Sequence, residues 1–152
     1  MWRGALWWGG YLILAIWLQK FFPGLDALAP ACIICLQEES RERSMIFLLF
    51  CIIIQEGAGT FPFGLSIVWY SLIMLMYYVG QWFFMSGNFM FVAALSLALG
   101  LGRLIVAQLA FFLHPLRPDL PALLAACALQ IIFTPPLWLL GYKSRSVLRA
   151  QR

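Results

Sequence analysis

The sequence predicts an all-helical integral membrane protein, a compact bundle of about six transmembrane helices of which two are short. Of its 152 residues, 64% are hydrophobic and only 11% are charged, and the mean hydropathy is +0.91. An ordinary soluble domain is about 25% charged. Lipid is therefore the expected solvent, and one domain is enough for this length. No hydrophilic segment is long enough to form a soluble catalytic domain.

Glycine, proline and charged residues divide the apolar sequence into six expected spans. Their approximate bounds are 5–22, 28–40, 44–57, 63–85, 89–113 and 121–141, and a basic tail follows over 142–152. No small-x-small cleavage site follows the first span, so we expect it to be retained. Pro135-Pro136 is expected to kink the last span or end it early.

The second and third spans have apolar cores too short for a bilayer. At 1.5 Å per residue, neither core alone crosses about 30 Å of hydrocarbon. Either each helix extends into the charged run between them and crosses where the membrane is thin or inside the bundle, or the two form a re-entrant hairpin covered by protein. Short crossing helices are the favoured interpretation.

The basic residues predict which side each end of the chain occupies. Six crossings place both termini on one side, which then holds seven basic residues against two on the other: Arg3, Arg41, Arg43, Lys143, Arg145, Arg149 and Arg152 against Lys20 and Arg117. Because cytoplasmic loops are enriched in Lys and Arg, we expect both termini in the cytoplasm. Separately from the charge count, the membrane is expected to be a bacterial inner membrane. The net charge of +4 is then no sign of nucleic-acid binding. Lys143, Arg145, Arg149 and Arg152 are interpreted as an anchor on the anionic lipid bilayer.

The segment from Met45 to Gly64 contains the most conspicuous break in the chain. Its apolar run ends at Glu56 and continues as Gly57, Gly59, Pro62 and Gly64. Glycine and proline at these positions interrupt a straight helix and leave the Glu56 carboxylate beside unwound backbone. This hinge is the expected location of any site.

Arg103 lies inside the fifth span, and charges within a membrane are usually paired or functional. Its position in the span places it toward the outer half of the membrane, where Glu56 is also expected. We therefore predict an intramembrane pair between Glu56 and Arg103, with Gln55, Gln108 and Gln130 as further buried hydrogen-bonding residues. In the alternative, Arg103 extends outward to the lipid headgroups.

Cys32 and Cys35 form a C-x-x-C pair near the outer end of the second span. A pair at this spacing is typical of a redox disulfide, and its place after the first helix resembles the DsbB family of quinone-linked thiol-disulfide oxidoreductases. That family also uses a loop cysteine pair, whereas Cys51 and Cys127 lie in apolar spans here. Two small residues on a buried helix are the favoured interpretation.

No other motif in the sequence indicates chemistry. The chain contains no P-loop, GxSxG or HExxH motif, and its single histidine, His114, lies in a proline-rich linker. We therefore expect no catalytic residue, no metal and no cofactor. Gly80, Gly100 and Gly102 are expected to allow close helix packing or to form a docking groove for another membrane helix.

The order of features along nearly the whole chain resembles the rod-shape-determining membrane protein family MreD. The features that carry the resemblance are Leu18-Gln19, Pro30, the EESRERS turn, Glu56, Phe63-Gly64, Thr134-Pro135-Pro136 and the KSRSVLR tail. The chain departs from the family at its acidic position, because the family usually has a glycine shortly before an aspartate. Here the acid is Glu56, preceded by Cys51, Ile52 and Ile53.

The resemblance implies a fold like that of the S-components of energy-coupling-factor transporters. It also implies a non-enzymatic scaffold of the cell-wall elongation machinery. Such a scaffold would bind an MreC-like bitopic partner and, through it, MreB filaments and the cell-wall synthases. Two alternatives stay open: a quinone-linked thiol oxidoreductase that uses Cys32 and Cys35, and a solute-binding transport subunit, which the implied fold permits.

Overall fold

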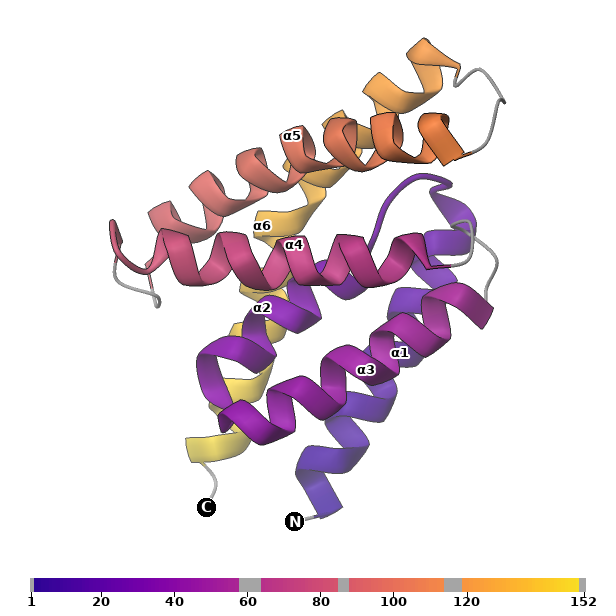
Figure 1. The fold of residues 1–152 in the computed structure, drawn as a ribbon. Helices are drawn as coiled ribbons and strands as arrows, with labels where there is room; N and C mark the ends of the chain where they lie inside the picture. The colour runs from indigo at the N-terminus through magenta and orange to yellow at the C-terminus, as the bar shows by residue number, and fades with distance from the viewer. Residues whose placement is uncertain (1, 58–63, 85–87, 114–118, 151–152) are drawn as a thin grey trace.

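The computed structural model describes residues 2–57, 64–84, 88–113 and 119–150. Within these ranges the chain forms six α-helices and no strand (Figure 1), which confirms the all-helical class. The helices are α1 (Trp2–Phe21), α2 (Leu28–Glu38), α3 (Arg41–Gly57), α4 (Leu65–Gly80), α5 (Phe89–Leu113) and α6 (Leu120–Ala150). In the described part of the chain, α5 and α6 are long and apolar enough to cross a membrane.

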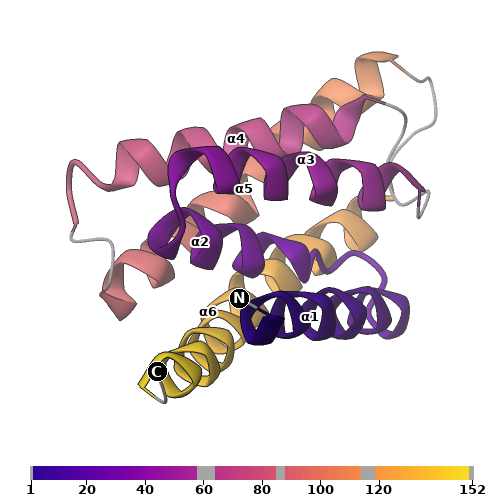
Figure 2. The same cartoon turned by 90° about the horizontal axis from the view of Figure 1, so that it is seen from below.

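The short helix α2 lies at the centre of the bundle. It packs against α1, α3, α4 and α6, and Figure 2 shows α3 and α4 on one side of it and α1 and α6 on the other. Every residue from Leu28 to Cys35 is buried. A helix that is apolar on all sides is expected to be buried on all sides. Protein therefore surrounds α2. A helix enclosed by protein does not itself have to match the thickness of a bilayer.

The neighbouring helix α3 begins in the charged run, at Arg41, and continues to Gly57. The expected extension of this short span into its polar flank is thus present in the structure. At 1.5 Å per residue, its 17 residues give a length of about 25 Å. Its outer face is apolar and exposed, with Ile46, Leu49 and Ile53 among the exposed side chains.

The last helix corrects the expectation that Pro135-Pro136 would end it early. α6 continues through both prolines to Ala150, so the expected tail over 142–150 is helical. The prolines cannot donate to the carbonyl groups one turn earlier. Packing on both sides of the prolines compensates, since Thr134 is fully buried and Trp138 nearly so. The correction matters because it brings Arg145 into the bundle.

Glycines set the close approach of α5 to its neighbours. A Cβ atom on Gly100 would lie 2.4 Å from Cγ1 of Ile131 in α6, and one on Gly102 would lie 2.9 Å from Cδ2 of Leu72 in α4. Both distances are shorter than real Cβ contacts. The packing role that the sequence suggests for these glycines agrees with this geometry.

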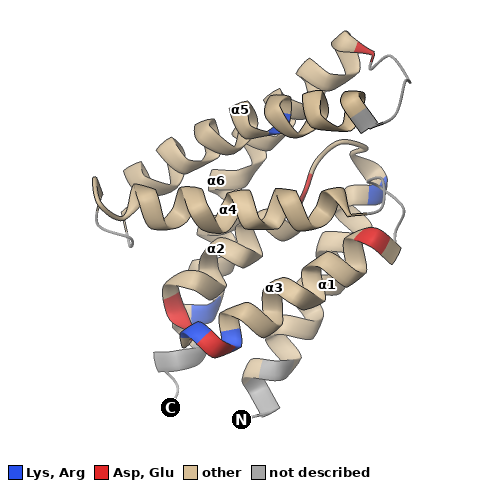
Figure 3. Ribbon diagram, viewed as in Figure 1, with Lys and Arg blue, Asp and Glu red and all other residues tan. Residues whose placement is uncertain are grey.

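The surface between the two ends of the bundle is apolar. In Figure 3 most charged residues lie near the helix ends, and a basic residue also lies within α5, where the helix sequence contains Arg103. Large side chains are exposed along the outer faces of α1, α3, α5 and α6, including Leu6, Leu14, Trp17, Phe50, Leu97, Leu101, Ile105, Phe112, Leu124, Ile132 and Leu140. A soluble monomer rarely exposes so continuous an apolar surface.

Candidate functional site

A fully buried carboxylate, Asp26, lies in the connection between α1 and α2. Trp69 Nε1 donates a hydrogen bond to Asp26 Oδ2 at 2.6 Å, and Gln19 Nε2 donates to Oδ1 at 3.0 Å. The main-chain nitrogen of Leu28 donates to Oδ1 at 2.9 Å, and the Tyr70 hydroxyl group does so at 3.4 Å. Ionised carboxylates accept strong hydrogen bonds, so these four donors offset much of the cost of burial. We refer to Asp26, the residues that bond it and the side chains bonded to those residues as the Asp26 centre.

The main chain of Asp26 is held as firmly as its side chain. Asp26 N donates to Gln130 Oε1 at 2.9 Å, and Gln130 Nε2 donates back to Asp26 O at 3.2 Å. Gln130 Nε2 also donates to Thr134 Oγ1 at 3.0 Å. On the other side, Gln19 Nε2 lies 3.3 Å from Gln55 Oε1. The centre therefore joins α1, α3, α4 and α6 to the connection before α2.

Arg103 lies beside this centre in α5. Its guanidinium carbon is 5.5 Å from the centroid of the Trp69 ring, and its side chain is buried. The N–H of the same Trp69 ring donates to Asp26 Oδ2. A buried cation gains stability from an aromatic ring that it faces. Trp69 thus contacts both charges, the carboxylate through its N–H and the cation through its ring.

The predicted pair of Glu56 and Arg103 needs correction, because the two residues have different neighbours. Glu56 Oε1 accepts a hydrogen bond from the main-chain nitrogen of Gly64 at 2.8 Å. α3, which carries Glu56, packs against α2 and α4, whereas α5 packs against α4 and α6. The physical reason is that α4 lies between the two helices. Asp26 stands where Glu56 was expected.

The residues of the expected hinge border two helix ends. α3 ends at Gly57, and Gly64 has φ +85°, a left-handed conformation that favours glycine, directly before α4. The Glu56 bond to Gly64 closes this connection. Gly59 and Pro62 lie outside the described residues. Glu56 therefore stabilises the backbone at the start of α4 and does not pair with Arg103.

The prediction of three buried glutamines is confirmed for two of them. Gln55 and Gln130 are buried as expected, and both belong to the Asp26 centre. Gln108 is exposed on the outer face of α5, which corrects its assignment as a buried residue. The difference arises because Gln108 lies on the face of α5 that points away from α4 and α6.

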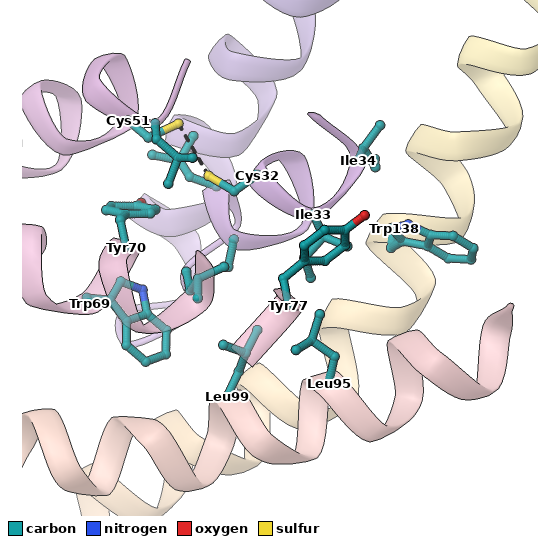
Figure 4. Packing of buried hydrophobic residues seen from close by; sticks show 14 of the residues in the cluster. Cys32, Ile33, Ile34, Cys51, Trp69, Tyr70, Tyr77, Leu95, Leu99 and Trp138 are labelled. Carbon is teal, nitrogen blue, oxygen red and sulfur yellow. Dashed lines mark hydrogen bonds between the residues drawn. The ribbon is translucent and has the colours of Figure 1, made fainter. Parts of the chain in front are cut away.

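The cysteines of the C-x-x-C pair face different partners. Cys32 Sγ lies 3.7 Å from Cys51 Sγ in α3, as the dashed line in Figure 4 shows. Cys35 Sγ lies 3.8 Å from Ser44 Oγ. All of these cysteines are free thiols and are buried. Figure 4 also shows Trp69 and Tyr70 on the same side of the core as this thiol pair.

A second charged cluster lies at the end of the bundle where the termini meet. Arg145 Nε lies 2.6 Å from Glu38 Oε2, and Arg145 also forms an ion pair with Glu39. The guanidinium carbon is 4.5 Å from the Trp8 ring centroid and 5.4 Å from that of Trp7. The side chains of Arg145 and Glu38 are only 10% and 8% exposed. We refer to these five residues as the Arg145 cluster.

The Arg145 cluster corrects one expectation. Arg145 was assigned to a lipid-binding anchor, yet it joins α6 to the α2–α3 turn and to α1. Two acids of the charged run between α2 and α3, Glu38 and Glu39, hold it there. Lys143 is exposed as an anchor requires, whereas the side chains of Arg149 and Arg152 lie outside the described part. Continuation of α6 beyond the prolines causes this difference.

Asp26 is the functional residue that sequence reasoning missed. It is a single acid between Pro23-Gly24 and Pro30, in a stretch that reads as a simple loop. One signal was present: an Asp two residues before a helix accepts a bond from that helix's first N–H groups. The long-range donors carry no such local signal.

Comparisons with family models, curated proteins and solved structures give no match to this chain. In the described residues, no three His, Cys, Asp or Glu side chains are grouped so that they could hold a metal ion. The function must therefore be argued from the geometry.

Proposed function

We propose that the chain is a multi-pass protein of the bacterial inner membrane and a non-enzymatic scaffold of the rod-shape machinery. The observation that carries the membrane part of the proposal is the exposed apolar surface between two charged ends. Exposure of such a surface to lipid is favourable, whereas its exposure to water is unfavourable. The buried polar groups support the scaffold part, because in the Asp26 centre and the Arg145 cluster they bond helices to one another.

A groove between α4 and α5 offers a surface for a partner. Its volume is about 300 Å³, and apolar side chains line it, among them Leu72, Met76, Phe91, Ala94 and Leu95. Gly80 in α4 lines the groove, and its missing Cβ leaves room for the Phe91 ring. In membranes, helices associate through close packing at small residues. We assign the groove to the transmembrane helix of an MreC-like bitopic partner, which would connect the scaffold to MreB filaments and the cell-wall synthases.

The test is copurification of the chain with an MreC-like partner in mild detergent. Ala94 is exposed and lines the groove, so Ala94→Trp fills it without disturbing the core. Ala128→Trp is the matched control, because Ala128 is exposed on α6 and is not part of the groove lining. We expect the wild type and Ala128→Trp to retain the partner and Ala94→Trp to lose at least tenfold. Equal retention by both variants would remove the groove from the proposal, and no copurification with the wild type would overturn the scaffold function.

The burial of the thiols favours the scaffold over a thiol oxidoreductase. Thiol-disulfide exchange requires a thiolate that an external partner can reach, whereas Cys32 and Cys35 are enclosed in the central helix. The solute-binding alternative requires polar groups that face a ligand. In the Asp26 centre, the side chains of Gln19, Gln130 and Trp69 bond to Asp26. These polar groups therefore bond within the protein, which disfavours the solute-binding alternative.

A further inference from the structure

The hydrogen-bond donors around Asp26 come from parts of the chain that are far apart in sequence. Trp69 and Tyr70 are on α4, Gln19 is on α1, and the Leu28 nitrogen begins α2. All of them converge on one carboxylate group. Each of these side chains is itself buried, so its position is fixed by the packing of its own helix rather than by Asp26 alone.

Asp26, whose carboxylate accepts from all of these donors, does not belong to a helix. Leu25, Asp26 and Ala27 form a buried stretch of connection between α1 and α2. Turns at Gly24, with φ +100°, allow the chain to enter the bundle there. A carboxylate on a short non-helical segment thus occupies a polar space enclosed by four helices.

The charge of the surroundings suits an anion rather than a neutral group. Arg103 lies over the Trp69 ring, and the side chains that donate to the Asp26 carboxylate, those of Trp69, Tyr70 and Gln19, are uncharged. Removing that carboxylate would take this acceptor away from the three side chains and from the Leu28 nitrogen, beside a buried cation. Such a space favours an anion that accepts several hydrogen bonds at once.

We propose that Trp69, Tyr70, Gln19 and the Leu28 nitrogen form a carboxylate-binding site that the chain fills with its own Asp26 side chain, and that a small free carboxylate binds there when this side chain is removed. Asp26 is then an internal ligand. The α1–α2 connection is held in the bundle through this side chain, which is bound as a free carboxylate would be. The proposal does not depend on the scaffold function.

Chemical rescue of truncated variants tests the proposal. Asp26→Ala removes a group the size of formate, and Asp26→Gly removes one the size of acetate. The apparent Tm of each purified variant is measured in detergent with formate, acetate, neutral acetamide or chloride at equal concentration and ionic strength. We expect formate to raise the Tm of Asp26→Ala by about 4 °C in a saturable manner, and acetate to do so for Asp26→Gly.

Asp26→Asn is the matched control, because it keeps the volume of the side chain and leaves no room for a free carboxylate. Its Tm and that of the wild type should respond to formate no more than to chloride. If neither truncated variant gains stability from its matching carboxylate beyond the gain in chloride, the site does not exist. An equal gain in Asp26→Asn would overturn the proposal as well.

A truncated variant that does not survive extraction remains testable in cells. Its amount in the membrane is then compared after growth with added formate, acetate or chloride, beside Asp26→Asn under the same conditions. Recovery of Asp26→Ala with formate alone supports the site. The same low yield in formate and in chloride counts against it.

Discussion

Gln130 holds the main chain of Asp26 through both ends of its carboxamide, accepting from Asp26 N at 2.9 Å and donating to Asp26 O at 3.2 Å. This reciprocal pair resembles one rung of a β-ladder in which a side chain replaces a strand. It fixes a non-helical residue beside the first half of α6. The connection is thereby kept inside a helical bundle with the N–H and C=O groups of Asp26 both bonded.

We predict that Gln130→Leu destabilises the protein by about 3 kcal/mol. The substitution leaves the N–H and C=O groups of Asp26 buried without partners, and each such group costs about 1–3 kcal/mol. The measurement is the free energy of unfolding in mixed detergent micelles. Gln108→Leu is the control, since Gln108 is exposed and should change stability by less than about 0.5 kcal/mol. Equal losses in the two variants would contradict this account.

Trp69→Phe should cost about 1.5–3 kcal/mol, because it removes a hydrogen bond to a charged group while keeping an aromatic ring beside Arg103. A double-mutant cycle with Asp26→Asn isolates the bond. We expect a coupling energy of at least about 1 kcal/mol between these two substitutions. Additive losses would mean that the 2.6 Å contact contributes nothing specific.

For the Arg145 cluster, we expect Arg145→Ala to cost about 3 kcal/mol, because it leaves two carboxylates in a mostly enclosed site. Lys143→Ala is the control, two residues away and exposed, and should be nearly neutral. Arg145→Lys should recover only part of the loss, since an ammonium group cannot bond both acids in a fixed fork. Indistinguishable unfolding of the Arg145 and Lys143 variants would restore the interpretation of Arg145 as a simple lipid anchor.

Gly100→Ala should destabilise the packing of α5 on α6 by about 1–3 kcal/mol, as overpacking does. Its Cβ would lie 2.4 Å from Ile131. Combining it with Ile131→Ala should lower the cost of the glycine substitution. Gly9→Ala is the control, because nothing lies within 4 Å of a Cβ there, and it should be neutral or slightly stabilising.

Mild oxidation with a copper–phenanthroline complex should join Cys32 to Cys51, whose sulfur atoms are 3.7 Å apart. Cys35→Ser should leave the cross-link intact and Cys51→Ser should abolish it, as peptide mass spectrometry of the digested protein would reveal. A Cys32–Cys35 disulfide in its place would favour the oxidoreductase alternative and count against the arrangement of α2 and α3.

Local patterns were enough to predict the helices. The apolar runs and their Gly, Pro and charged breaks correspond to six helices in the described part of the chain, with bounds close to those expected except in α6. There, proline chemistry predicted an end that tertiary packing around Thr134 and Trp138 overrides. A local rule of this kind describes an isolated helix, and α6 is not isolated.

The candidate site was predictable only in its types of residue. The sequence indicated a buried carboxylate, a buried arginine and buried glutamines near one end of the bundle, and it selected Glu56 as the carboxylate. The choice between Glu56 and Asp26 depends on which loop enters the bundle. That is a long-range property. The local signal at Asp26, its place two residues before a helix, predicts only the bond to the Leu28 nitrogen and does not indicate that the loop enters the bundle.

The central position of α2 has a consequence for biogenesis. α2 is made early, yet α6, one of the helices that enclose it, is made only after α3, α4 and α5. Until α6 arrives, the Asp26 peptide groups lack the carboxamide of Gln130, and Glu38 and Glu39 lack Arg145. A nascent chain truncated before α6 would therefore leave polar groups of the Asp26 connection and of the α2–α3 turn without the partners that complete the fold.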